Sequence, residues 1–428
     1  MQPIRVGLMG LGTVGTGVVR IVEGHRDDLE KQVGSPIVIE KILVKDKSKS
    51  RRMTVADSLL TEDPRDIVEN PDIDVVVEVM GGVESTRELI LSALERGKHV
   101  VTANKDLMAV YGPEILAKAA EKNCDVFYEA SVAGGIPIIR TLIEGFSSDR
   151  LTKIMGIVNG TTNYILTKMS QEGASYADVL KEAQELGYAE ADPTSDVEGL
   201  DAARKMAILA TLGFRAEVSL GDVAVKGITS VTREDIVYAK RLGYEIKLLG
   251  IAERSGDAIG VSVQPTMVKV SHPLSSVNGV FNAVYVYGEA VGETMFYGPG
   301  AGELPTATSV VADLVAVVKN LKLGVNGRRM FTPYKEKKLK TADEIKSKNF
   351  LLLHVDDKAG VLARITQVFA EHNVSLESVI QQPNPSNPSA EIVIVTHEAS
   401  QASLNNVLAH LTDLPVMRKI QSHYRVEG

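Results

Sequence analysis

The amino-acid sequence predicts an α/β protein with a doubly wound parallel-sheet domain, an α+β domain and a C-terminal ferredoxin-like βαββαβ domain. Three observations carry this prediction. The length of 428 residues corresponds to about three domains of ordinary size. Short apolar segments alternate with helical segments over residues 1–130, and this pattern changes near residue 151. Residues 349–428 then show the element order βαββαβ.

The composition excludes several classes of protein. The 44% hydrophobic and 24% charged residues are typical of a folded chain, and the net charge of -8 argues against a general nucleic-acid binder. Aromatic residues make up only 5%, which disfavours a stacking platform for single strands. Cys124 is the single cysteine, so an internal disulfide or a multi-cysteine zinc site is excluded. Since no stretch reaches the roughly 18 apolar residues that span a bilayer, we expect a cytoplasmic protein.

The first domain is predicted over residues 1–130. Residues 4–9 are apolar and end in glycines, which is typical of a buried parallel strand. Residues 13 to about 32 have apolar positions at helical spacing. Strands that alternate with helices form mostly parallel sheets with right-handed crossovers. The other elements predicted here are strands at 37–44, 74–80, 99–102 and 125–129 and helices at 86–96 and 113–122.

Three glycines follow the first strand and open the first helix. Gly10 permits a tight turn, Gly12 lets a pyrophosphate approach the backbone, and Gly15 lets helix and strand pack closely. The free N–H groups at the start of the helix, including those of Thr13 and Val14, would face the phosphates. The arrangement therefore predicts a Rossmann domain that binds a dinucleotide, and a merely structural turn is the alternative.

The loop after the second strand bears on the choice between NADP and NAD. Five of the eight residues 45–52 are basic, and basic side chains here accept a 2′-phosphate. Lys45 is the nearest candidate, so we predict NADP. Asp46 keeps NAD as the alternative, because an acid at this position binds the ribose hydroxyl. A solvated surface loop is the other interpretation of the charge run.

The second domain is predicted over 131–325 as an α+β domain. Helical periodicity at 176–186, 199–212 and 232–242 precedes runs that are typical of antiparallel strands. Those runs lie at 244–252 and 260–270. An apolar helix at 306–321 is expected to pack back on the first domain.

Carboxylates and a lysine are concentrated between residues 187 and 205. Asp201 and Lys205 are four residues apart and hence neighbours on one helix face. Taken alone, this spacing indicates a surface ion pair, and Asp196 can simply cap the helix. The adjacent helix positions are apolar, however, so the helix is predicted to be largely buried. Buried carboxylates and a buried lysine need each other or a polar ligand, and such a lysine can transfer protons.

The spacing G-Y-x-E-x-D-P-x-x-D-[aliphatic]-x-G-x-D-x-x-x-K in this segment resembles the signature of homoserine dehydrogenases. The resemblance covers essentially the whole chain and includes residues 100–105, 128–137, 159–164 and 298–302. It implies a reversible, NAD(P)H-dependent reduction of L-aspartate 4-semialdehyde to L-homoserine. This reaction belongs to the biosynthesis of threonine, methionine and isoleucine.

The resemblance implies that residues 131–325 form a substrate-binding, catalytic and dimerisation domain. It also implies roles for individual residues. Lys205 and Lys105 resemble the catalytic lysines, and Lys105 lies beside the nicotinamide. Glu190 and Asp201 resemble the carboxylates that hold the cationic amino group of homoserine, with Asp196 in support. Further contacts are implied to the substrate at Gly160 and Thr161 and to the cofactor at Gly187 and Gly302.

A monovalent cation, Na⁺, is implied as well. Its ligands would be the carboxylate of Glu129 and the carbonyls of Val132, Gly134 and Ile136, and oxygen ligands suit such a hard cation. The alternative for Glu129 is a carboxylate that caps a helix or is satisfied within the core. Zinc is not required, because the eight histidines are scattered without an H-x-x-x-H pair.

The charged segment 326–348 is predicted as a linker or exposed helix before the domain at 349–428. Within that domain, residues 355–363 resemble the strand-turn-helix motif of ACT domains, in which Gly360 and nearby N–H groups hold an amino-acid carboxylate. Asn373 begins the next turn, and Ala359 replaces the usual proline, which leaves the turn less rigid. The predicted strands are 350–355, 375–382, 390–396 and 416–424, the helices 361–372 and 400–412, and a PNPSNPS turn lies at 383–389.

The ACT resemblance implies an amino-acid effector, expected to be threonine, and subunits that pair in a dimer or tetramer. The alternative is an oligomerisation module whose ligand site is idle. Two other functions remain open. Another Rossmann oxidoreductase, such as a sugar dehydrogenase, shares the glycine motif but predicts neither the 190–205 spacing nor the ACT module. A non-enzymatic amino-acid sensor would have no need of proton-transfer lysines.

Overall fold

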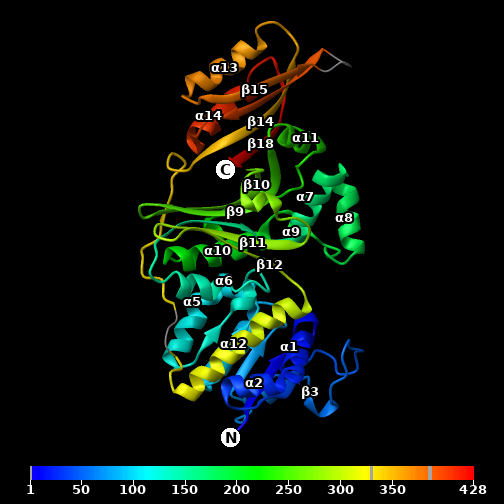
Figure 1. Cartoon of the computed structure of the whole chain (residues 1–428), viewed down its shortest axis with the longest axis vertical. Helices are drawn as coiled ribbons and strands as arrows, with labels where there is room; N and C mark the ends of the chain where they lie inside the picture. Colours follow the sequence, from blue (N-terminus) through cyan, green and yellow to red (C-terminus); the bar gives the residue numbers. More distant parts are fainter. Residues whose placement is uncertain (1, 328–330, 384–387) are drawn as a thin grey trace. The chain divides into compact units, whose positions relative to one another are not determined.

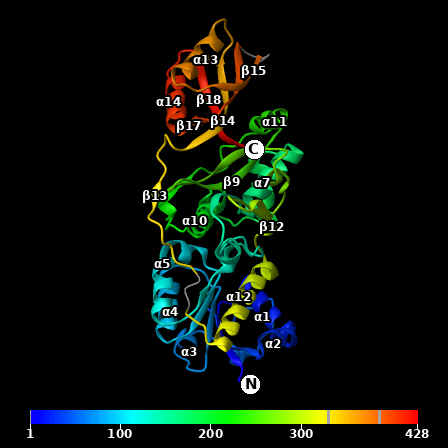
Figure 2. The same cartoon turned by 60° about the vertical axis from the view of Figure 1, so that its left-hand side comes forward.

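A computed structural model describes residues 2–327, 331–383 and 388–428 of the chain. It consists of two compact units, each assembled from three stretches of sequence (Figures 1 and 2). The first unit comprises Met1–Leu151, Ala207–Gly221 and Asn282–Glu336. The second unit comprises Thr152–Met206, Asp222–Phe281 and Lys337–Gly428.

A parallel sheet forms the centre of the first unit. Its strand order is β3-β2-β1-β4-β5-β6, and every neighbouring pair is parallel. This is the order of a doubly wound dinucleotide-binding sheet, with the topological switch between β1 and β4. The Rossmann prediction is confirmed. The strands are β1 (Ile4–Met9), β2 (Ile37–Leu43), β3 (Leu60–Thr61), β4 (Val75–Glu78), β5 (His99–Thr102) and β6 (Val126–Phe127).

Two of the predicted helices differ from the structure. The helix expected at 13–32 is interrupted at His25, whose φ of -110° and ψ of 20° end α1 (Thr13–Gly24) before α2 (Arg26–Val33) begins. The helix expected at 113–122 begins earlier, as α5 (Lys105–Glu121), because Asn104 caps it and Pro113 lies inside it. The other helices of this segment are α3 (Arg65–Val68) and α4 (Glu84–Glu95).

Helix α12 (Glu303–Leu323) returns to the Rossmann sheet, as predicted. A Cβ atom on Gly17 of α1 would lie 2.5 Å from the carbonyl oxygen of Glu303, so a glycine is needed where the two helices meet. Figure 1 shows α12 in yellow beside α1 in blue. Against expectation, α12 is long and apolar enough to cross a bilayer by length and composition, but 56% of its apolar window is buried inside the structure. Its valines and leucines join the core that surrounds β1 and α1.

Several shorter elements complete the first unit. They include the end of α10 (Leu200–Phe214), which crosses from the second unit, and most of β11 (Phe281–Gly288). The others are η2 (Glu129–Ser131), α6 (Ile138–Arg140), η3 (Thr141–Gly145) and β12 (Gly292–Pro299).

A single sheet path runs through the second unit, in the order β7-β9-β10-β18-β14-β16-β15. Strands β9 and β10 are antiparallel, as predicted. The last strand of the chain, β18, pairs in parallel with β10 through Thr266 opposite Arg425 and Val268 opposite Glu427. The strands are β7 (Leu151–Ile157), β9 (Tyr244–Ser255), β10 (Ala258–Lys269), β14 (Lys346–Asp356), β15 (Leu376–Pro383), β16 (Ser389–Thr396) and β18 (Met417–Glu427).

Between β7 and β11 the second unit contains further helices and one short strand. α7 begins directly after Asn159, whose side chain accepts a hydrogen bond from the backbone N–H of Thr162. α11 begins with a capping box formed by Thr232 and Asp235. The elements are α7 (Gly160–Glu172), α8 (Tyr176–Glu185), α9 (Thr194–Val197), β8 (Val223–Val225), α11 (Arg233–Arg241) and η5 (Pro273–Ser276).

The C-terminal region has the predicted βαββαβ order. Helices α13 (Val361–Glu371) and α14 (Gln401–Thr412) pack on one face of β14 and β16 and form a separate apolar core. The segment before it contains the two-residue strand β13 (Lys338–Leu339), and β17 (Ala399–Ser400) pairs with β14. Gly360 precedes α13 with a φ of 86°, and Asn373 has a φ of 55°. Of the turn predicted at 383–389, residues 384–387 lie outside the described part of the chain.

Candidate active site

The glycine loop of the first unit leaves room for a ligand at one position and for none at two others. A Cβ atom on Gly10, which has a φ of 106°, would lie 2.9 Å from the carbonyl oxygen of Val79, and one on Gly15 would collide with the carbonyl oxygen of Gly10. A Cβ atom on Gly12 would meet nothing within 4 Å. Gly12 stands at the N-cap of α1, where the N–H groups of the first turn have no partner within the helix. This start of α1 is suited to bind a pyrophosphate.

The basic loop after β2 holds its one acidic side chain in a local turn. The Asp46 carboxylate accepts hydrogen bonds from the backbone N–H of Ser48 at 2.7 Å and from its hydroxyl at 2.6 Å. These bonds lower the pKa of Asp46. Arg51 donates to the carbonyl oxygens of Asp46, Lys47 and Lys49, while Lys45 is exposed. Both residues are exposed, but the Asp46 carboxylate is engaged by hydrogen bonds within the loop.

A buried carboxylate supports the start of the helix that carries Lys105. Glu78 at the end of β4 accepts from the Thr102 hydroxyl at 2.6 Å and from the backbone N–H groups of Met80 and Gly81. Thr102 in turn accepts from the N–H of Asn104, the N-cap of α5. Burial raises the pKa of Glu78, and these hydrogen bonds oppose that rise. Sequence reasoning did not identify Glu78, although a carboxylate inside an apolar strand is an unusual feature.

Four polar side chains of the second unit form one hydrogen-bonded cluster. The Lys205 ammonium donates to the Asp201 carboxylate and to the carbonyl oxygen of Val158, both at 2.7 Å. The Asn159 amide donates to Asp201 at 2.9 Å and to Asp196 at 2.7 Å. Burial raises the pKa of Asp196, which the Asn159 hydrogen bond partly offsets.

The cluster decides one alternative that the sequence left open, which is whether Asp201 and Lys205 form a surface ion pair. The side chains of Lys205 and Asp201 are only 13% and 9% exposed, so their ion pair is not the surface pair that the i,i+4 spacing alone would indicate. Asp196 lies in the first turn of α9, and its side chain bonds to Asn159.

Two other predicted substrate residues lie next to this cluster along the chain. Gly160 is the first residue of α7, and a Cβ atom there would lie 2.9 Å from the carbonyl oxygen of Val280. The Thr161 hydroxyl donates to the carbonyl oxygen of Tyr188 at 2.6 Å and so fixes the start of the 187–193 loop. In that loop Gly187 has a φ of 75° and Glu190 is exposed. The structure therefore groups Asp196, Asp201 and Lys205, whereas Glu190 stands on a separate, solvent-facing loop.

A buried lysine that sequence reasoning missed holds the segment next to Gly160. Lys247 of β9 is 2% exposed and donates to the carbonyl oxygen of Val277 at 2.6 Å and to the Asn278 side chain at 3.0 Å. Asn163 donates to carbonyl oxygens of the same segment. Burial lowers the pKa of Lys247 to about 8. The sequence did contain a signal for this buried lysine, because Lys247 interrupts an otherwise apolar run in the predicted strand.

Glu129 of the first unit is a buried carboxylate with backbone partners. Its two oxygens accept from the N–H groups of Ile139 at 2.7 Å and Arg140 at 2.8 Å, so it caps α6. Its own N–H donates to Asp313 of α12, which also accepts from the Arg140 guanidinium at 2.8 Å. Burial raises the pKa of Glu129 and raises that of Asp313 to about 7. The helix-capping role considered for Glu129 is present.

The three carbonyls assigned with Glu129 belong to the tight turn that follows it. Gly134 has a φ of 47° and packs so closely on Gly300 that a side chain would not fit. The carbonyl oxygen of Gly134 accepts from Ser309 at 2.7 Å, and that of Ile136 accepts from the N–H of Ile138. Each oxygen retains a second lone pair. The turn from Val132 onward thus offers carbonyl oxygens that fit a hard cation. Gly302, assigned to the cofactor, caps α12 with a φ of 122°.

Three family models match the chain. Residues 10–129 match the NAD-binding domain of homoserine dehydrogenase, residues 137–315 match homoserine dehydrogenase, and residues 350–416 match the ACT domain. A homoserine dehydrogenase of Bacillus subtilis (strain 168) is 60% identical over 100% of this chain and 99% of its own length. One from Corynebacterium glutamicum is 43% identical over 99% of this chain and 96% of its own length.

Solved structures agree with these matches. A crystal structure of a homoserine dehydrogenase from Thiobacillus denitrificans has a TM-score of 0.94 at 41% identity and covers 100% of this chain and 99% of its own. A hyperthermophilic archaeal homoserine dehydrogenase in complex with NADPH has a TM-score of 0.63 at 28% identity, covering 75% of this chain and 98% of its own. On the identity and extent of these matches, the chain belongs to the homoserine dehydrogenase family, a family of oxidoreductases, and carries an ACT domain.

Proposed function

We propose that the chain catalyses the reversible NADPH-dependent reduction of L-aspartate 4-semialdehyde to L-homoserine, with Lys205 as the proton donor. The observation that carries this proposal is the largely buried ammonium of Lys205, held by Asp201 and by the carbonyl oxygen of Val158. Hydride delivery to the aldehyde carbon leaves negative charge on its oxygen. A positioned ammonium stabilises that charge and donates the proton that completes the alcohol. In the reverse direction, neutral Lys205 accepts the hydroxyl proton of homoserine.

The amino-acid end of the substrate would meet the carboxylates. Homoserine and the semialdehyde carry an ammonium group, which Asp201 and Glu190 are suited to bind, with Asp196 positioned through Asn159. Gly160 and Thr161 at the start of α7 would supply further contacts. Because Glu190 lies on an exposed loop, we infer that this loop approaches the substrate when it binds.

The cofactor would contact the glycine loop and three other positions. Gly10, Gly12, Thr13, Val14 and Gly15 surround the start of α1, which suits a pyrophosphate. The other positions assigned to the cofactor are Lys105, Gly187 and Gly302. NADPH is the cofactor bound in the archaeal homoserine dehydrogenase described above, and the engaged Asp46 with exposed Lys45 supports the same preference here.

Replacing Lys45 by alanine is expected to raise the KM for NADPH roughly tenfold, the effect of about 1.4 kcal/mol, and to leave the KM for NADH nearly unchanged. The reason is that only NADPH carries the 2′-phosphate that the ammonium would neutralise. Steady-state kinetics with both cofactors measure this, with Lys49→Ala in the same loop as the matched control. Equal turnover of the unmodified enzyme with NADPH and NADH at matched concentrations would contradict the preference.

Feedback control by threonine through the ACT domain is the second part of the proposal. The turn at Gly360 opens α13 with N–H groups that can bind an amino-acid carboxylate. We expect threonine to lower the rate of NADPH oxidation with aspartate semialdehyde, followed at the nicotinamide absorbance. Homoserine dehydrogenase activity with no response to threonine would discard the regulatory assignment and keep the enzyme assignment. No NADPH oxidation would discard both.

The remaining parts of the proposal concern the cation, the assembly and the location. Glu129 with the carbonyls of Val132, Gly134 and Ile136 would hold Na⁺ in a structural role. The melting temperature is expected to be higher in Na⁺ than in choline, and equal values would contradict the cation site.

The proposed assembly is a dimer or tetramer, which light scattering would measure. The exposed apolar side chains Val291 and Tyr297, the latter on β12, support such an assembly. A cytoplasmic location is proposed from the family's biosynthetic role.

A further inference from the structure

Three metal-ligating side chains converge in the second unit, where the ACT domain meets α11. They are Glu234 on α11, His354 on β14 and Glu391 on β16. One ligand atom of each lies within 4.8 Å of the other two. The three residues come from three separate elements, so their convergence is produced by the tertiary fold rather than by sequence spacing. Neither the proposed catalysis nor the ACT ligand turn uses them.

The backbone fixes two of these side chains on one face of the sheet. His354 and Glu391 are directly opposite each other in the antiparallel register of β14 and β16. Leu353 and Val355, which flank His354 in β14, belong to the apolar core under α13 and α14. Because side chains alternate along a strand, His354 and Glu391 lie on the other face. Glu234 reaches the pair from the first turn of α11.

The imidazole of His354 lacks the partner that its position requires. Its Nε2 atom is buried and has no hydrogen-bond partner within the described part of the chain. The nearest carboxylate oxygen of Glu234 lies 3.7 Å away, which is too long for a hydrogen bond but close to the separation of two ligands on one metal ion. The Nε2 atom faces two carboxylates, and a metal cation between the three groups would satisfy all of them.

A neighbouring tyrosine holds the second carboxylate in place. The Tyr238 hydroxyl of α11 donates to Oε2 of Glu391 at 2.5 Å. Burial and this hydrogen bond raise the pKa of Tyr238, so the hydroxyl keeps its proton and acts as a donor. Arg241, one turn further along the same helix, donates to the side-chain oxygen of Gln382 on β15. Its guanidinium is therefore bonded to Gln382 and Glu391 is bonded to Tyr238. Such support of a ligating carboxylate is the usual arrangement around protein-bound metals.

We propose that Glu234, His354 and Glu391 bind one divalent transition-metal ion of the Zn²⁺ class, which fastens the ACT sheet to α11. One imidazole nitrogen and two carboxylate oxygens suit Zn²⁺, Co²⁺ or Ni²⁺ far better than Mg²⁺, which prefers oxygen ligands alone. A water molecule would complete four-coordination, and the exposed side of Glu234 gives the ion access. The ion would stabilise the folded chain, because the three ligands come together only after folding.

The test uses the full chain after removal of metals with EDTA. Zn²⁺ binding is measured by calorimetric titration and by the change in melting temperature. In a separate sample, Co²⁺ is added and its visible d–d absorption is recorded. We expect one equivalent of Zn²⁺ to raise the melting temperature and Co²⁺ to give the spectrum of a nitrogen–oxygen site. His354→Ala and Glu234→Gln should each weaken Zn²⁺ binding at least tenfold, with NADPH-dependent activity retained as evidence of folding.

His410→Ala is the matched control. Nδ1 of His410 on α14 lies 2.7 Å from Nε2 of His372, next to the end of α13. This histidine pair is an alternative place where added Zn²⁺ could bind. Unchanged Zn²⁺ binding in His410→Ala supports the proposed site. Loss of binding in His410→Ala but not in His354→Ala would overturn it. So would a chain that binds no Zn²⁺.

Discussion

Replacing Lys205 by alanine lowers kcat for aspartate semialdehyde reduction by about 10²- to 10⁴-fold, the usual contribution of a positioned acid–base group. The variant loses the ammonium that would stabilise the developing alkoxide and donate its proton. Steady-state rates of NADPH oxidation measure the loss. Lys181→Ala serves as the matched control, because that lysine side chain is 77% exposed on α8. Turnover like that of the unmodified enzyme would remove Lys205 from the mechanism.

A second substitution separates proton transfer from support of the fold. Lys205→Ala also leaves the nearly buried Asp201 without its cation, and such a loss can destabilise the chain. Lys205→Arg retains the charge next to Asp201 but cannot lose a proton near neutral pH. We therefore expect Lys205→Arg to keep a normal melting temperature and to fail in homoserine oxidation, which needs a neutral base. A drop in melting temperature that parallels the loss of activity in both variants would assign Lys205 a structural role instead.

Features decided by nearby residues were predictable from the sequence. The glycine loop after β1 and the i,i+4 neighbours Asp201 and Lys205 depend on short-range geometry, and both are found as expected. The errors also have local causes. Pro113 suggested a helix start, since proline favours the first turn, but the cap is Asn104. The break at His25 was missed although Gly24 directly precedes it, and glycine is a common residue at helix ends.

Contacts between distant segments could not be predicted. Asn159 was part of a recognised run, yet its bridging of Asp196 and Asp201 depends on how α7, α9 and α10 meet. Lys247 was assigned to a strand without a role, because its partners lie 30 residues away in the segment after η5. The parallel pairing of β18 with β10 was likewise invisible, since the sequence defined the C-terminal domain as a unit of its own.

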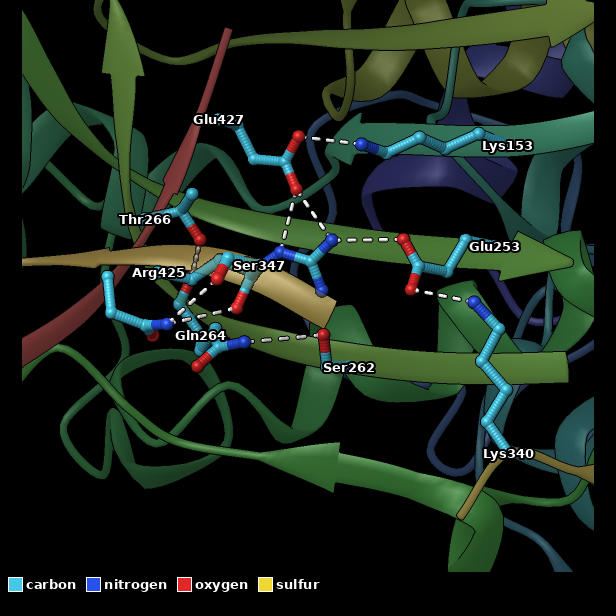
Figure 3. A network of polar contacts seen from close by, with 10 residues as sticks. Lys153, Glu253, Ser262, Gln264, Thr266, Lys340, Ser347, Arg425 and Glu427 are labelled. Carbon is cyan, nitrogen blue, oxygen red and sulfur yellow. Dashed lines mark hydrogen bonds and ion pairs between the residues drawn. The ribbon is translucent and has the colours of Figure 1, made fainter. Parts of the chain in front are cut away.

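That pairing is secured by a buried charge network in the second unit (Figure 3). Arg425 of β18 donates to Glu253 of β9 at 2.9 Å and to Glu427 at 2.6 Å. Lys153 donates to Glu427 at 2.6 Å, and Lys340 donates to Glu253 at 3.0 Å. The Arg425 side chain is only 8% exposed. The guanidinium thus stands between two carboxylates that have little water to solvate them, and this network holds β18 against β10.

Arg425→Met is therefore expected to destabilise the docking of β18 by about 3–5 kcal/mol, since it leaves two nearly buried carboxylates with one cation fewer. Loss of amide hydrogen-exchange protection in residues 417–427 and a lower melting temperature measure the effect. Arg418→Met on the same strand is the control. Its ion pair with Asp356 is 41% exposed on the arginine side, so a cost below about 1 kcal/mol is expected. Equal losses of stability in the two variants would show that the buried network contributes no more than an exposed ion pair.

The pH dependence of the Arg425→Met defect gives an independent check on its cause. Burial alone would raise the pKa of Glu253, but attraction to Arg425 and Lys340 outweighs it, and the pKa lies below its usual value. A depressed folded-state pKa contributes stability above the unfolded pKa of about 4.3, which is lost as the pH falls. In Arg425→Met only Lys340 still opposes the effect of burial, so the Glu253 pKa rises and protonation relieves the excess negative charge. The difference in melting temperature between the two proteins should therefore narrow from pH 7 to pH 4.5, and a constant difference would assign the defect to lost packing.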